Sequence, residues 1–170
     1  MKVQIVLNTD ECINIELYKE IAPKSVENFM KLVKSGYYNN TVFHRIINGF
    51  MIQTGGYKIE DNTLYELGDV ESIPGEFSSN GFKNDLKHEL GVISMARTSD
   101  PNSATSQFFI CAGTPSWLDG EYAAFGKTID EASNQAVLNV ASMPTMNIGG
   151  GFSDFPQFEV KILEIKVIEE

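Results

Sequence analysis

Alternating hydrophobic and polar positions at both ends of the chain predict β-strands. Residues 3–7 and 13–17 each place apolar side chains at every second position, and the polar stretch 8–11 between them is typical of a turn, so together they predict a β-hairpin. Residues 158–167 also alternate, but the phase changes by one residue between Ile162 and Leu163. Because such a change moves side chains to the other face of a sheet, we expect a bulge or sharp bend there.

Two segments have the periodicity of helices. Pro23 suits a first helical turn, and the apolar residues that follow it are spaced i, i+3, i+4, i+7 until Gly36, which is well placed to end the helix. A second helix is predicted near 131–142, with Asp130 as its N-cap and Pro144 just beyond its end.

The middle of the chain predicts further short strands. Two apolar runs, 42–47 and 50–53, flank Asn48-Gly49, which is a strong signal for a hairpin turn. Arg45 and Gln53 are therefore expected on paired strands. The segment 55–90 that follows the hairpin is predicted to be irregular, and long irregular segments in compact domains are often functional. Three further strands are expected after it. These strands cover residues 91–95, 107–111 and 123–127.

This inventory of elements predicts the fold class. About seven or eight short strands, two helices and no βαβ alternation favour a mainly β protein, an antiparallel barrel with helices covering its open ends. The 170 residues show no break in composition, so one domain spanning 1–170 is expected.

Charge and composition narrow the possible functions. The formal net charge is −10 and the 13 basic residues are scattered, which disfavours nucleic-acid binding. No apolar run reaches the roughly 18 residues that cross a membrane, and the N-terminus reads as a strand rather than a signal peptide. We expect a cytoplasmic monomer with no membrane attachment and no cofactor. Cys12 and Cys111 are expected to be buried free thiols, without a disulfide or metal.

Several other chemistries have weak support. The segment 120–128 has five residues between its glycines, where a phosphate-binding Walker A loop has four. A Cys111 nucleophile would need His44 or His88 as its base. His44 is expected to point to the opposite face from Arg45 and to act structurally, bonded to nearby backbone.

Arg45 stands out because of the residues around it. Aromatic, thioether and amide side chains on neighbouring elements are consistent with a concave peptide pocket, although periodicity alone could also place the aromatic residues in the core. The residues concerned are Phe50, Met51, Gln53, Gln107, Phe109 and Trp117.

Four segments in order resemble the cyclophilin family. The most distinctive is Phe43-His44-Arg45-Ile46-Ile47-Asn48-Gly49-Phe50-Met51-Ile52-Gln53. The others are 22–29, then 91–97 with 106–110, and 117–120 with 125–127. The matches run through nearly the whole chain. Three positions depart from the common family pattern: Asn48 stands where proline is common, Arg97 where asparagine is frequent, and Tyr122 where many eukaryotic members have histidine.

The resemblance implies a closed eight-stranded antiparallel β-barrel capped by two α-helices, and peptidyl-prolyl cis-trans isomerase activity on peptides and unfolded proteins. It implies that Arg45 is catalytic, that Phe50, Met51, Phe109 and Leu118 receive the proline ring, and that Gln53 and Gln107 orient the peptide and Arg45. It further implies that Ala96 and Arg97 present backbone groups, that Tyr122 contacts substrate, and that Trp117 contacts cyclosporin.

Two alternatives remain open. The chain could be a proline-binding module or chaperone with little turnover, or an all-β scaffold that binds partners through 55–90.

Overall fold

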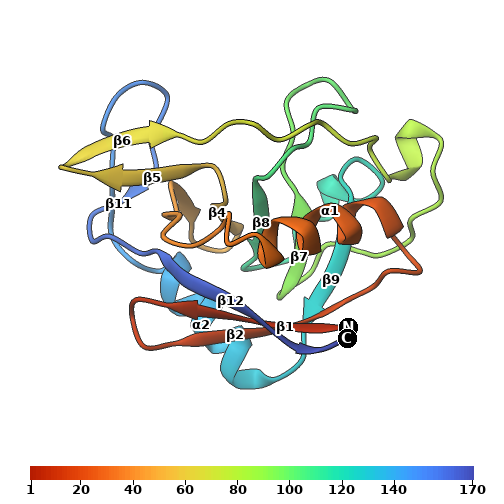
Figure 1. The fold of residues 1–170 in the computed structure, drawn as a ribbon, viewed down its shortest axis with the longest axis horizontal. Helices are drawn as coiled ribbons and strands as arrows, with labels where there is room; N and C mark the ends of the chain where they lie inside the picture. Colours follow the sequence, from red (N-terminus) through yellow and green to blue (C-terminus); the bar gives the residue numbers. More distant parts are fainter.

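The computed structural model describes residues 1–170, and eight of its strands form one curled antiparallel sheet (Figure 1). In sheet order the strands are β12 (Ile162–Glu169), β1 (Lys2–Leu7), β2 (Cys12–Leu17), β9 (Ala124–Thr128), β7 (Val92–Met95), β8 (Phe108–Cys111), β4 (Met51–Thr54) and β3 (Arg45–Ile47). The chain ends lie side by side because Lys2 of β1 pairs with Glu169 of β12.

The two outer strands of this sheet barely meet. They approach through an isolated bridge between Val42 and Lys161, next to a hydrogen bond of 2.8 Å from Phe43 N to Val160 O. Both contacts fall just before β3 and β12 begin, so no continuous ladder joins the outer strands. The mainly β fold is confirmed, but the expected closed barrel is a curled sheet whose outer edges meet only over the short segments 40–43 and 160–162.

Two helices pack apolar residues against the interior of the curled sheet. Helix α1 (Pro23–Lys34) begins at Pro23, and Gly36, with φ +75°, follows its end as predicted. Helix α2 (Glu131–Ala141) contacts β2, β3 and β4, and the Asp130 side chain caps it by accepting a 2.8 Å bond from Ser133 N. Both helices contribute to the main core, which the first and last strands also line.

Helix α1 has an unusual N-terminus. Ala22 occupies the N-cap position and offers no capping side chain. The buried Glu76 carboxylate replaces it, accepting bonds from Lys24 N at 3.1 Å, Ser25 N at 2.6 Å and Ser25 Oγ at 2.8 Å. A negative group satisfies the free N–H groups of a helix start and complements its dipole. Glu76 therefore ties the segment 67–90 to α1.

The segment 55–90 is more regular than the sequence predicts. Strands β5 (Tyr57–Glu60) and β6 (Thr63–Glu66) form a hairpin around Asp61 and Asn62, whose φ angles are +51° and +62°. Positive φ at both central residues is the signature of a two-residue hairpin turn that Asp and Asn tolerate. A short 3₁₀ helix, η1 (Ser78–Asn80), follows, so the prediction of an irregular stretch was wrong for these residues.

The bulge predicted in the last strand is confirmed. Val6 pairs with Glu164 and Leu7 with Ile162, which leaves Leu163 without a partner. Two small elements complete the fold: β10 (Thr145–Met146) pairs with β11 (Phe155–Pro156), and a second 3₁₀ helix, η2 (Ser116–Leu118), precedes β9.

Strand alternation gives this sheet two apolar faces. Phe108 and Ile110 of β8 point into the main core, whereas Phe109 and Cys111 belong to a second, smaller cluster. Met51, Val92 and Leu118 complete most of that cluster from β4, β7 and η2. Because side chains of a strand alternate in direction, the smaller cluster lies on the outer face of the sheet.

Candidate functional site

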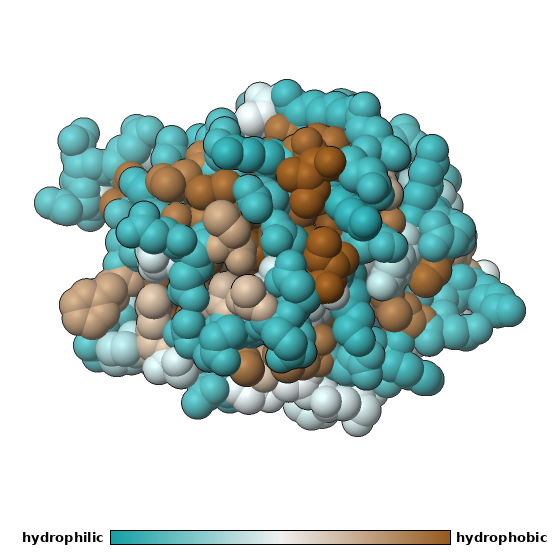
Figure 2. All heavy atoms as spheres, turned by 90° about the horizontal axis from the view of Figure 1, so that it is seen from below, coloured by the Kyte–Doolittle hydropathy of each residue, from teal (hydrophilic) through white to brown (hydrophobic).

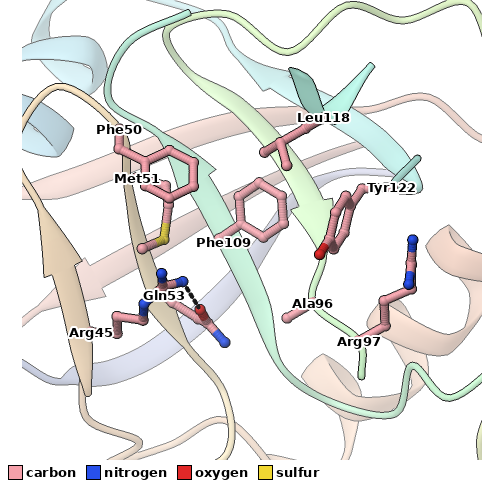
Figure 3. Close-up of a pocket in the computed structure, with 9 residues that line it drawn as sticks. All are labelled: Arg45, Phe50, Met51, Gln53, Ala96, Arg97, Phe109, Leu118 and Tyr122. Atoms are coloured by element: carbon pink, nitrogen blue, oxygen red, sulfur yellow. Dashed lines mark hydrogen bonds between the residues drawn. The ribbon is translucent and has the colours of Figure 1, made fainter. Parts of the chain in front are cut away.

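A cavity of about 150 Å³ opens on this outer face (Figure 3). Strand β4, the end of β7, strand β8 and the segment around η2 supply its walls. Nine of the eleven side chains proposed from the sequence line it: Arg45, Phe50, Met51, Gln53, Ala96, Arg97, Phe109, Leu118 and Tyr122. The other two are its neighbours, since Gln107 bonds to Gln53 and the Trp117 ring lies 5.4 Å from the Phe50 ring.

A chain of hydrogen bonds fixes the polar edge of the cavity. Arg45 and Gln53 are direct cross-strand partners on β3 and β4, as the hairpin signal predicted. Arg45 Nη1 donates to Gln53 Oε1 at 3.3 Å, and Gln53 Nε2 donates to Gln107 Oε1 at 2.9 Å. The Gln53 amide is thereby oriented by both neighbours. The guanidinium, which also lies 5.7 Å from the Phe50 ring centre, remains exposed at the cavity mouth.

Phe109 forms the floor of the cavity. Its side chain is 5% exposed, and the Tyr122 ring stands edge-on to it at 5.8 Å and 81°. Met51 and Leu118 flank it from β4 and η2. The result is an apolar recess with a cationic donor at one side, which is the form that sites for small apolar groups take.

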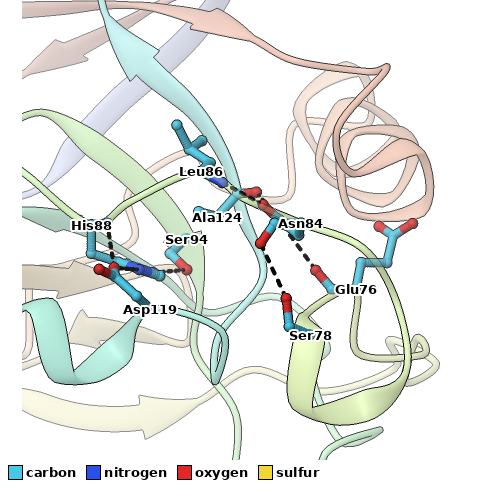
Figure 4. Close-up of polar contacts among 8 residues, drawn as sticks. All are labelled: Glu76, Ser78, Asn84, Leu86, His88, Ser94, Asp119 and Ala124. Atoms are coloured by element: carbon cyan, nitrogen blue, oxygen red, sulfur yellow. Dashed lines mark hydrogen bonds and ion pairs between the residues drawn. The ribbon is translucent and has the colours of Figure 1, made fainter.

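A buried polar network lies against Phe109, and Figure 4 shows its side chains. The His88 ring is stacked on Phe109 at 6.0 Å, with Asp119 Oδ1 3.1 Å from Nδ1 and Ser94 Oγ 2.9 Å from Nε2. Asp119 also accepts the His88 backbone N–H at 2.6 Å. Burial lowers the pKa of His88, with Asp119 opposing that effect. A carboxylate only accepts, so in the neutral ring Nδ1–H donates to Asp119 and Nε2 accepts from Ser94.

Asn84 is a second buried anchor near these residues. Its amide donates to the carbonyls of Glu76 and Ala124, both at 2.9 Å, while its oxygen accepts from Leu86 N at 3.1 Å (Figure 4). These bonds hold the segment 76–86 against β9. Nothing in the residue pattern singles out Asn84, His88, Ser94 or Asp119, because their roles arise from contacts between segments far apart in the chain.

Two other chemistries considered from the sequence do not fit the geometry. Cys111 is buried in the smaller cluster, and burial raises the pKa of its thiol to about 12, so it is not a nucleophile. Cys12, expected to be buried, is partly exposed. No three His, Cys, Asp or Glu side chains are grouped as a metal site would require. No helix is both long and apolar enough to cross a bilayer.

His44 is buried, as expected of a structural residue, but its hydrogen bonding differs from the prediction. No backbone group bonds its Nδ1, which has no protein partner at all. The ring instead packs against Tyr57 at 4.7 Å. Burial, with the Arg45 charge as a smaller cause, lowers the pKa of His44 to about 4.

Comparison with known proteins decides the family. Residues 2–167 match the model of the cyclophilin type peptidyl-prolyl cis-trans isomerase family. The chain belongs to the cyclophilin family. It is 42% identical over 156 residues to peptidyl-prolyl cis-trans isomerase-like 1 of Emericella nidulans, covering 91% of this chain and 88% of that protein. It is 40% identical over 160 residues to a peptidyl-prolyl cis-trans isomerase of Acinetobacter baylyi, covering 91% and 79%.

Solved cyclophilins share the fold as well. A cyclophilin of Cryptosporidium parvum, crystallised in the presence of the dipeptide Ala-Pro, has 32% identity and a TM-score of 0.78, with both chains covered completely. This cyclophilin is accordingly a peptidyl-prolyl cis-trans isomerase, which catalyses rotation about the bond that precedes proline.

Proposed function

We propose that the cavity above Phe109 holds the substrate proline ring and that Arg45 is the catalytic group. The observation that carries this proposal is the Arg45–Gln53–Gln107 chain of hydrogen bonds along one edge of an otherwise apolar recess. A cavity of about 150 Å³ suits such a ring, since an engineered cavity of ~150 Å³ in another protein accepts benzene.

The chemistry needs no covalent intermediate. The amide before proline resists rotation by about 18–20 kcal/mol because its C–N bond has partial double-bond character. A guanidinium that donates to the proline nitrogen favours the pyramidal form, in which the lone pair no longer conjugates with the carbonyl. That contact lowers the barrier only if it is stronger in the twisted state than in either planar state. A donor held by Gln53 needs little reorganisation, which favours Arg45 for this role.

The remaining lining residues have binding roles in this proposal. Phe50, Met51, Phe109 and Leu118 clamp the ring, so that one side of the bond is fixed while the other rotates. Gln53 and Gln107 orient the peptide backbone together with Arg45. The Ala96 N–H already donates to Gln107 O at 3.0 Å, so the backbone group it can offer to substrate is its carbonyl.

Exchange spectroscopy of a short Ala-Pro-Phe peptide by NMR tests the assignment. We expect Arg45→Ala to lower turnover by roughly 100-fold or more, the effect of losing one fixed transition-state donor. Arg45→Lys should restore little, because an ammonium lacks the planar fork of donors. Lys58→Ala, which removes a cation outside the cavity, is the control. Turnover near wild type in Arg45→Ala contradicts the proposal, and peptide binding by the wild type without exchange indicates a binding module.

We also propose cyclosporin as a ligand of the same surface. Trp117 is 66% exposed beside the cavity and against Phe50, so a large apolar ligand over the recess can reach it. Tyr122, where many family members have histidine, is the position expected to alter affinity. Calorimetric titration of the wild type and of Trp117→Ala tests this, and equal affinity excludes Trp117 from the contact.

Finally, we propose that residues 1–170 act as one monomeric isomerase domain in the cytoplasm, on unfolded proteins with accessible prolines. Two free thiols suit a reducing compartment. Figure 2 shows the apolar side chains of one face divided by hydrophilic ones, which favours a monomer. Light scattering after gel filtration tests the oligomeric state, and a mass near twice 18.9 kDa would contradict it.

A further inference from the structure

Arg97 makes more contacts than a residue that offers only its backbone to substrate. Its Nε and Nη2 both donate to the Glu121 carbonyl, at 3.2 and 2.6 Å, and its Nη1 donates to the Thr98 carbonyl at 2.9 Å. The guanidinium carbon lies 4.5 Å from the centre of the Tyr122 ring and 4.8 Å from that of Phe77. One side chain thus joins three segments at the end of the cavity.

Tyr122 is the residue that these contacts restrain. It lies in the irregular stretch between η2 and β9, outside any strand. The edge of its ring meets Phe109 on one side, and Arg97 lies over its face on another. Its hydroxyl makes no hydrogen bond within the protein, and in Figure 3 the oxygen points into the cavity on the side of Ala96.

Elementary energetics explain why a loop tyrosine needs such a partner. A flexible loop side chain loses rotamer entropy when it binds a ligand, and restraint in the free protein reduces that loss. A cation over an aromatic face is attracted to the ring quadrupole. A planar guanidinium can at the same time donate hydrogen bonds to carbonyl oxygens beside the ring. The two bonds to Glu121 O hold the residue next to Tyr122 in the chain, so ring and backbone are fixed together.

We propose that Arg97 is a positioning residue that holds Tyr122 edge-on to Phe109, so that the free hydroxyl is ready to bond a backbone group of the peptide next to the proline. This inference rests on the proposed role of the cavity as the proline site. Arg97 acts through Tyr122 and leaves the Arg45 chemistry unchanged, so its loss raises KM while kcat changes little.

A double-mutant cycle on kcat/KM tests the proposal. We expect Arg97→Ala to lower kcat/KM about 5- to 10-fold, mostly through KM, given the strength of a cation–aromatic contact. In a Tyr122→Ala background the same substitution should lower it less than about 2-fold, because the group it positions is gone. Arg97→Lys should recover only part of the loss, since an ammonium lacks the planar fork with which Arg97 bonds both carbonyls while it lies over the ring.

Two further measurements keep the result decisive. Lys83→Ala removes an exposed cation from the neighbouring surface, and unchanged kcat/KM there excludes a simple effect of net charge. Fluorotyrosine NMR follows the Tyr122 ring without catalysis, with Tyr122→Phe assigning its signal. We expect the Arg97→Ala signal to shift toward that of a mobile tyrosine. Equal losses in both backgrounds, or an unchanged ring signal, overturn the inference, whereas a wild type without turnover overturns only the proposed function.

Discussion

The buried ring of His44 predicts a loss of stability in mild acid. The side chain is 6% exposed and Nδ1 lacks a partner, so the charged imidazolium is poorly solvated in the folded state. Burial first and the Arg45 charge second lower the pKa of His44 from 6.5 to about 4. Between these values the unfolded chain binds the proton and the folded one does not. Stability is therefore fully present above pH 6.5 and falls until about pH 4.

The size of the effect follows from linkage. Each unit of pKa difference between the unfolded and the folded state corresponds to about 1.4 kcal/mol. The shift of the His44 pKa from 6.5 to about 4 therefore corresponds to roughly 3 kcal/mol of unfolding free energy, of which roughly 2 kcal/mol is lost by pH 5. Urea unfolding of the wild type and of His44→Gln, measured from pH 5 to pH 7.5, isolates this contribution, because carboxylates and His88 titrate in both proteins. We expect the difference in unfolding free energy to change by about 2 kcal/mol over that range. Parallel curves would refute the reasoning.

Two other residues give predictions of different kinds. Iodoacetamide at pH 8 should modify the native protein at Cys12 and leave Cys111 intact, because burial and a thiol pKa of about 12 protect Cys111. Mass spectrometry of the native and the urea-unfolded protein measures the modification of each thiol, and a Cys111 adduct in the native protein would contradict the prediction. Glu76→Ala should lower the free energy of unfolding by about 2–3 kcal/mol, since it removes the hydrogen bonds that the carboxylate accepts at the start of α1. The control Glu71→Ala should change the free energy of unfolding by less than about 0.5 kcal/mol.

Sequence patterns predicted correctly those features that residues close together in the chain determine. The Asn48-Gly49 turn placed Arg45 opposite Gln53, Asp130 proved to be the cap of α2, and the phase change near Leu163 marked a bulge. In each case neighbours in the sequence, or a short hairpin, determine the geometry. The family resemblance then indicated the lining of the cavity, which periodicity alone could not separate from core residues.

Features that depend on distant contacts were missed. Ala22 offers no capping side chain, and only the folded chain brings Glu76, more than fifty residues away, to that helix start. From the sequence His88 was considered only as a possible base for Cys111, yet its ring is stacked on Phe109 and bonded to Ser94 and Asp119. The hairpin at Asp61-Asn62 is different, because its turn signal is local but does not stand out among the polar residues around it.

The location of the site on the outer face follows from how the sheet is filled. Phe108 and Ile110 fill the interior of the curled sheet together with apolar residues of both helices. The outward residues of β4 and β8, Met51, Gln53 and Phe109, face a side that the helices leave uncovered. On that outer face Phe109 belongs to the smaller apolar cluster, and the hydrogen-bonded His88 and Asp119 lie beside it. Because such a network is directional, it fixes the orientation of the floor more narrowly than apolar packing of the same volume would.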